Sequence, residues 1–154
     1  MSVTFTDEQT RAVDGDALVD LAERVLRHEG YPATTELAIT AVEDEVIAAM
    51  KGEYLGESAV TDVLSFPIED FEPGQAPIRQ SDGPPVMLGD VVIAPSHIAR
   101  QALDHGVSEL SELSLMVVHG ILHLMGWDHV VDDEAEAMER REREILALVG
   151  VERR

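Results

Sequence analysis

The sequence contains no cysteine. This absence excludes disulfide bonds, a thiolate nucleophile and every metal site that depends on thiolate ligands. A metal ion could therefore be bound only through histidine, aspartate or glutamate side chains. We expect no disulfide-linked partner.

Basic residues are also scarce. The chain has 11 lysines and arginines against 31 aspartates and glutamates, which gives a formal net charge of -20. The averaged field repels phosphate backbones and counts against broad affinity for nucleic acids. A local cationic groove or a bound metal ion can still override this field, because salt screens charges beyond about 8 to 10 Å.

No hydrophobic run approaches the roughly 20 residues that a membrane-spanning helix needs, so we expect no membrane partner. The first residues, MSVTFTDEQT, have neither the positive start nor the apolar stretch of a secretory signal. A length of 154 residues is close to the commonest size of one domain. We therefore expect a single cytoplasmic domain over residues 1–154.

Hydrophobic periodicity divides the chain into strands and helices. The expected strands lie near residues 3–5 and in the segments TELAITAVED (35–44), DVLSFPI (62–68) and VMLGDVVIAP (86–95). The expected helices cover residues 16–30, 43–51, 95–106, 108–126 and 132–150. Strands come early and helices late, with one helix between the first two strands, which favours a layered α+β fold.

Turn-forming residues mark the ends of these elements. Asp14 or Asp16 can cap the first helix, and Gly30 can end it. Pro67 should end its strand or place it at the edge of the sheet. The Pro- and Gly-rich segment 72–85 is expected to form a long loop.

The segment HGILHLMGWDH carries a predicted metal site. His119 and His123 are four residues apart in an apolar helix, so both project from one face. Gly126 can end the helix in a left-handed turn that brings His129 back to the same ion. Three neutral nitrogens on one zinc ion leave a fourth position for water, which could act as a nucleophile with a pKa of about 7.

The alternative is that His119 and His123 are ordinary helix residues and that His129 lies in an unrelated loop. Three histidines with a glycine at the turn favour the metal site. The remaining histidines have no such spacing, and we expect surface or packing roles for His28, His97 and His105.

The same histidine spacing occurs in metzincin proteases, in which glutamate follows the first histidine and acts as the general base. Here that residue is Gly120, which cannot accept a proton. The difference weakens the protease interpretation. A substrate can instead supply its own proton acceptor, such as a phosphate oxygen, which would suit cleavage of a phosphodiester.

Three ordered segments resemble the YbeY family of bacterial endoribonucleases and rRNA maturation factors. HGILHLMGWDH matches the pattern H-G-x-L-H-L-x-G-[YFW]-D-H of that family. Two further segments, TDVLSFP at residues 61–67 and LGDVVIAP at residues 88–95, agree with motifs of that family and follow in the same order. The similarity spans roughly residues 36–138.

The resemblance implies a single αβα domain with a small mixed sheet and a helix that carries one Zn²⁺ on His119, His123 and His129. It also implies zinc-dependent, single-strand-specific cleavage of RNA in 16S rRNA 3' end maturation and ribosome quality control. The partners would be an rRNA precursor and the small ribosomal subunit. In addition, the resemblance places three polar residues near the metal, namely Thr61, Asp62 and Ser65, and assigns orientation of the ligand-bearing turn to Asp128.

The residues themselves leave these assignments open. Asp62, Ser65 and Asp128 are candidate catalytic residues, but Asp62 and Ser65 could simply satisfy turns while Val63 and its apolar neighbours pack in the core. Asp128 could accept the free ring N–H of a coordinating histidine or could cap the following turn.

One departure from the family concerns phosphate binding. Many members carry arginine directly after the aromatic residue in the segment before TDVLSFP, whereas Leu55 follows Tyr54 here, with Lys51 as the only basic residue nearby. Arginines in the last helix could supply positive charge, but we favour a solvated face in which they pair with glutamates. The arginines are Arg140, Arg141 and Arg143, and the glutamates are Glu136, Glu139, Glu142 and Glu144.

Three hypotheses follow for the function. The first is a zinc-dependent endoribonuclease that acts on rRNA precursors. The second is a zinc-dependent protease-like hydrolase. The third is a ribosome assembly factor whose zinc ion is structural.

Overall fold

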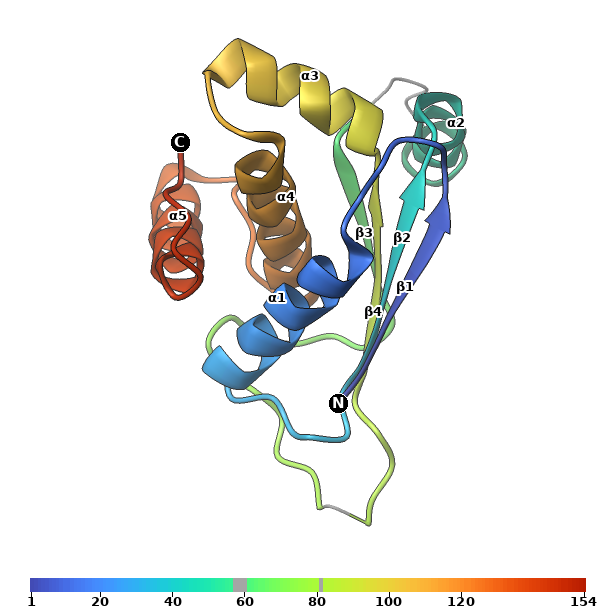
Figure 1. Ribbon diagram of the computed structural model, residues 1–154. Helices are drawn as coiled ribbons and strands as arrows, with labels where there is room; N and C mark the ends of the chain where they lie inside the picture. Colours follow the sequence, from blue (N-terminus) through green and yellow to red (C-terminus); the bar gives the residue numbers. More distant parts are fainter. Residues whose placement is uncertain (57–60, 81) are drawn as a thin grey trace.

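A mixed sheet forms the middle layer of the fold (Figure 1). The computed structural model describes residues 1–56, 61–80 and 82–154. The strand order is β1 (Ser2–Glu8), β2 (Glu36–Val42), β4 (Met87–Ile93) and β3 (Val63–Pro67). β2 is parallel to both β1 and β4, whereas β3 is antiparallel to β4.

Helices cover both faces of this sheet (Figure 1). α1 (Gly15–His28) and α4 (Glu109–Leu124) pack on one face, and α5 (Asp132–Ala147) packs against α4 on the outside. α2 (Asp44–Leu55) lies on the opposite face, and α3 (Pro95–His105) connects β4 to α4. The predicted α+β class with layered helices and a small mixed sheet is confirmed.

The ends of α1 follow the predicted signals. Asp14 caps the helix by accepting a hydrogen bond from the Ala17 N–H at 3.1 Å. Gly30 adopts a left-handed φ of 79° just after the helix. The apolar face of α1 enters the main core between the sheet and the helices, and its buried residues are Leu18, Leu21, Ala22, Val25 and Leu26.

The connection from β3 to β4 also follows the predicted pattern. β3 ends at Pro67 and lies at the edge of the sheet, where the missing N–H of proline is tolerated. Segment 72–85 forms a loop with one isolated bridge between Glu72 and Gln75, and Ser81 lies outside the described residues. The expected long loop is confirmed for its described part.

α2 extends beyond its expected end at Lys51 and continues to Leu55. Gly52 lies in the added turn, and glycine costs about 1 kcal/mol relative to alanine inside a helix, so the sequence favours an earlier end. Tyr54 in this turn packs edge-to-face against Phe66, with ring centres 5.4 Å apart. This contact between α2 and β3 opposes the local preference and extends the helix.

No single helix in the described part of the chain is long and apolar enough to cross a membrane. α3 and α4 meet the length and composition criteria only as a pair, and they are bent by 116° relative to each other. Much of α4 is buried in the core, where its apolar residues contact the sheet and the neighbouring helices.

Candidate metal centre

α4 brings His119 and His123 together on one face, with their Nε2 atoms 3.0 Å apart. The ring centre of His129 lies 5.3 Å from that of His119 and 4.9 Å from that of His123. One possible ligand atom from each of the three histidines lies within 4.8 Å of the others. The structure therefore brings the predicted ligand set together in a group that could hold a metal ion.

A glycine turn after α4 returns the chain toward the helix. The Gly126 N–H donates to the His123 carbonyl at 3.1 Å, and the Trp127 N–H donates to the Leu122 carbonyl at 3.0 Å. Gly126 has a φ of 96°, and a Cβ atom at this position would lie 2.0 Å from the backbone oxygen of Phe71. Only glycine fits this turn, which places the third histidine beside the first two.

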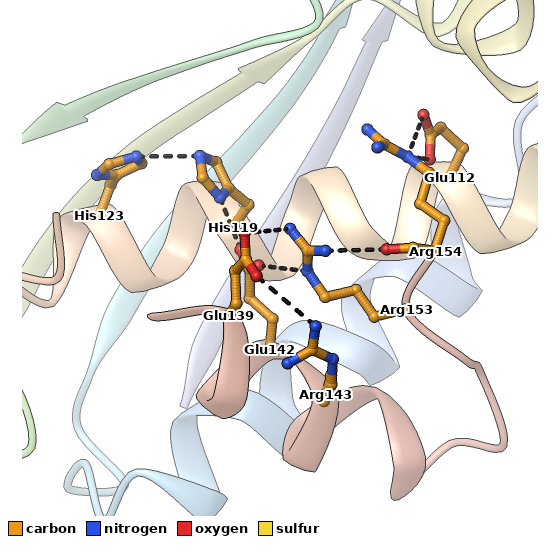
Figure 2. A network of polar contacts seen from close by, with 8 residues as sticks. All are labelled: Glu112, His119, His123, Glu139, Glu142, Arg143, Arg153 and Arg154. Atoms are coloured by element: carbon orange, nitrogen blue, oxygen red, sulfur yellow. Dashed lines mark hydrogen bonds and ion pairs between the residues drawn. The ribbon is translucent and has the colours of Figure 1, made fainter. Parts of the chain in front are cut away.

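Hydrogen bonds fix the protonation pattern of two rings, and Figure 2 shows the one between His119 and Glu142. His119 Nδ1 lies 2.6 Å from Glu142 Oε2, and His123 Nδ1 lies 2.9 Å from the Trp127 carbonyl oxygen. Burial raises the pKa of Glu142, but hydrogen bonds with His119 and Arg153 outweigh this effect and leave the pKa below its ordinary value. The ionised carboxylate and the carbonyl can only accept, so each Nδ1 carries the proton and each Nε2 has a free lone pair.

Two lone pairs that face each other at 3.0 Å repel unless a cation lies between them. Tetrahedral zinc with Zn–N distances of about 2.0 to 2.1 Å separates two ligand nitrogens by about 3.4 Å. Burial, followed by the charges of His119 and His129, lowers the pKa of His123 and favours the neutral ring that binds metal. The donor atoms and their protonation therefore suit a divalent metal ion.

Glu142 was not identified as part of this centre from the sequence. We expected it on a solvated face of the last helix, but its side chain is only 1 % exposed. Its partners are His119 and Arg153, whose Nε donates to Glu142 Oε1 at 2.8 Å. The sequence does carry a signal, because Glu142 has helical spacing from the buried residues Met138 and Ile145.

Glu142→Ala is expected to weaken zinc affinity by about 10- to 100-fold, because the outer partners of metal-binding histidines fix the tautomer and raise ligand basicity. Glu144→Ala is the matched control, since Glu144 lies exposed on the same helix and, among the described residues, pairs with Arg141 alone. Competition with a chromophoric zinc chelator measures both affinities. Equal zinc affinity of the two variants would show that Glu142 does not support the ligand.

Outside the centre, the remaining charged residues largely behave as predicted. Arg143 pairs with Glu139 at 3.6 Å on an exposed face, as predicted. Arg141 pairs with Glu144 at 3.5 Å but is only partly exposed, because it also contacts the buried Glu29 at 3.6 Å and lies over the Trp127 ring. The histidines without metal-site spacing contact other polar side chains away from the metal centre, namely His28, His97 and His105.

The position after the first histidine faces the sheet. A Cβ atom on Gly120 would lie 2.9 Å from Val91 Cγ1 and 3.0 Å from Val63 Cγ2. The Ser65 hydroxyl donates to the Gly120 carbonyl at 2.8 Å and joins β3 to α4. A glutamate at this position would enter a packed interface, so this fold has no room there for the general base of a metzincin.

The polar residues of the TDVLSFP segment share a cavity of about 690 Å³ with the three histidines. Thr61, Asp62 and Ser65 all line it. Asp62 Oδ1 accepts a hydrogen bond from the Val63 N–H at 2.8 Å and lies 3.4 Å from the Thr61 hydroxyl. These residues thus lie beside the three histidines, and each side chain also has a hydrogen-bond partner in the protein, which for Ser65 is the Gly120 carbonyl on α4.

Asp128 lies in the turn between the second and third histidines. Its Oδ1 accepts a hydrogen bond from the His129 backbone N–H at 2.8 Å. The ring N–H groups of the two helical histidines instead face Glu142 and the Trp127 carbonyl. The contact of Asp128 is therefore the turn-capping arrangement.

Comparison with known proteins supports a family assignment. The sequence model of the family described as Endoribonuclease YbeY matches residues 3–150. A protein of the same name from Thermobifida fusca is 40% identical, and the match covers 96% of this chain and 93% of the relative. Its namesake from Acidothermus cellulolyticus is 37% identical, with coverage of 100% and 94%, and that from Geobacillus thermodenitrificans is 36% identical, with coverage of 99% and 99%.

The fold also resembles a solved structure. The solution structure of TM1509 from Thermotoga maritima matches with a TM-score of 0.57 at 20% sequence identity, covering 96% of this chain and 91% of that protein. This likeness supports the fold alone. The family model and the relatives match almost the whole chain, including the turn that holds the three histidines, and on these grounds the chain belongs to the YbeY family.

Proposed function

We propose that this protein is a zinc-dependent endoribonuclease that cleaves single-stranded RNA in the cytoplasm. The observation that carries the proposal is the convergence of His119, His123 and His129 at one cavity. The helix that bears the first two histidines has Gly120 at the position where a metzincin has its general base. The names of the relatives support RNA as the substrate. We further propose that the RNA is an rRNA precursor, in 16S 3' end maturation and ribosome quality control on the small subunit.

The residues of the chain hold and orient the metal ligands. When bound, zinc would supply Lewis acidity toward a phosphate oxygen and a water of pKa about 7. His119, His123 and His129 would hold the ion through neutral nitrogens, and Glu142 keeps the first of these rings in the required tautomer. The two helical rings are half-buried, and their Nδ1 contacts with Glu142 and the Trp127 carbonyl limit their movement.

Asp62 is our candidate for orienting the attacking water or accepting its proton. Within the described ranges, it is the only carboxylate that lines both cavities next to His119 and His129. Ser65 and Asp128 would act as positioning residues, because Ser65 holds α4 on β3 and Asp128 holds the turn before the third ligand. All three assignments are proposals.

Metal removal is expected to reduce cleavage of a single-stranded RNA that includes a 16S 3' precursor end to background. One equivalent of zinc should restore cleavage, because the three histidines offer one ligand set within 4.8 Å and the ion supplies the chemistry of the site. Gel analysis of end-labelled RNA, with zinc content measured on the same samples, checks the result. Casein incubated with the zinc-loaded protein is the control substrate and should remain intact.

Each alternative gives a different result. Full RNA cleavage by verified metal-free protein would contradict the proposal. Casein turnover would favour a protease-like hydrolase. Zinc-loaded protein that binds the small ribosomal subunit but cleaves no RNA would favour an assembly factor with a structural zinc ion.

A further inference from the structure

The cavity at the histidines has an aromatic wall made by two separate elements. Tyr54 comes from the last turn of α2 and Phe66 comes from β3, and both line the cavity that contains the three histidines. The two rings meet edge-to-face at 5.4 Å with planes 68° apart. Tyr54 is 62 % exposed, so much of its surface remains available to a ligand.

The charge around this cavity is unusual for a site that binds a polyanion. None of its described lining residues is lysine or arginine. Arg153 and Arg154 line the neighbouring cavity, but their Nε atoms donate to the buried carboxylates of Glu142 at 2.8 Å and Glu112 at 2.7 Å (Figure 2). These cations are already neutralised, so pairing with phosphate can contribute little to binding here.

We propose that Tyr54 and Phe66 form a stacking subsite for one nucleobase of single-stranded RNA, next to the phosphodiester at the histidines. This inference rests on the proposed function and names how the substrate is held. Bases of a single strand are free to stack on an exposed aromatic ring, whereas those of a duplex already stack on each other. Because every base has a π-face, the subsite accepts any of the four bases and selects for an unpaired strand.

The first test compares Tyr54→Ala with Tyr54→Phe in the zinc-loaded protein. Loss of the ring is expected to raise KM for a short single-stranded RNA roughly tenfold with little change in kcat, because stacking holds substrate and transition state alike. Tyr54→Phe keeps the ring and should behave as the wild type. Leu103→Ala removes another exposed apolar side chain, on α3, and is the control outside the cavity.

The second test removes the base instead of the ring. The substrates are short single strands in which one phosphodiester is flanked by non-hydrolysable phosphonate linkages. They carry an abasic nucleotide on the 5' side of the phosphodiester, on its 3' side or on neither. With the wild-type protein, one of the two abasic substrates should have a KM raised by the same factor that Tyr54→Ala causes with the intact substrate. With Tyr54→Ala, that abasic substrate should have no higher KM than the intact one. Zinc content measured on all samples separates a stacking defect from loss of metal.

Salt dependence gives a third, independent measurement. Each cationic contact with phosphate contributes about -0.7 to the slope of log affinity against log salt for a single strand, so a slope shallower than about -1 is expected. A steeper slope would overturn the inference. An unchanged KM in Tyr54→Ala would also overturn it, and so would a KM that Tyr54→Ala raises as much with both abasic substrates as with the intact one. If the wild type neither binds nor cleaves RNA, the proposed function fails and the stacking subsite fails with it.

Discussion

His123→Ala is expected to abolish both stoichiometric zinc binding and RNA cleavage. His123 is held at its Nδ1 by the Trp127 carbonyl, and its Nε2 faces that of His119 at 3.0 Å. Loss of an outer partner of a metal ligand costs about 10- to 100-fold in affinity, so loss of a ligand should cost more than about 100-fold. Elemental analysis after gel filtration, together with cleavage of labelled RNA, measures both effects.

The control for this variant is His97→Ala. His97 lies on α3, where its ring contacts Arg100 and Gln101 and lies outside the histidine cluster. Its removal should leave zinc content and cleavage at wild-type levels. Circular dichroism of His123→Ala should retain the wild-type helix signal, because α4 is held by apolar residues on its other faces. A full equivalent of zinc in His123→Ala would contradict the assignment of this ligand.

Gly126→Ala is expected to lower the free energy of unfolding by about 3 kcal/mol or more. A left-handed conformation costs a non-glycine residue about 1 to 2 kcal/mol, and forcing extra carbon into a packed site costs about 1 to 3 kcal/mol. The added Cβ would lie 2.0 Å from the Phe71 backbone oxygen, which no side-chain rotation can relieve. Urea unfolding of the metal-free protein measures this loss without the contribution of the ion.

Gly106→Ala separates the two terms of this effect. Gly106 ends α3 with a φ of 68°, but a Cβ atom there would meet nothing within 4 Å. This variant should therefore lose only the backbone term of about 1 to 2 kcal/mol. If both variants lose the same free energy of unfolding, the turn at Gly126 can move away from Phe71 without an energetic cost.

The sequence predicts the clustering of the three histidines well because the information for it is local. The ligands and the turn lie in one segment, residues 119–129, and helix geometry alone places His119 and His123 on one face. The strands, the edge position of Pro67 and the cap of α1 are likewise governed by neighbouring residues. These parts of the fold could be predicted without knowing how the layers pack.

The features that the sequence did not predict depend on contacts between distant elements. Glu142 supports His119 from α5, across 23 residues of sequence. The last turn of α2 exists with Gly52 inside it because Tyr54 contacts Phe66 on β3. The charge pattern of α5 favours a solvated Glu142, and the helix propensity of Gly52 favours an earlier end of α2. Tertiary packing overrides both local preferences.

The packing of Gly120 restricts the evolution of this metal centre. Glycine and glutamate can be separated by a single nucleotide, since GGA or GGG becomes a glutamate codon by one change. Yet Val91 and Val63 occupy the space where the new side chain would begin. The exchange becomes accessible only after smaller residues have appeared in β3 and β4, so several mutations, in a restricted order, separate the two chemistries.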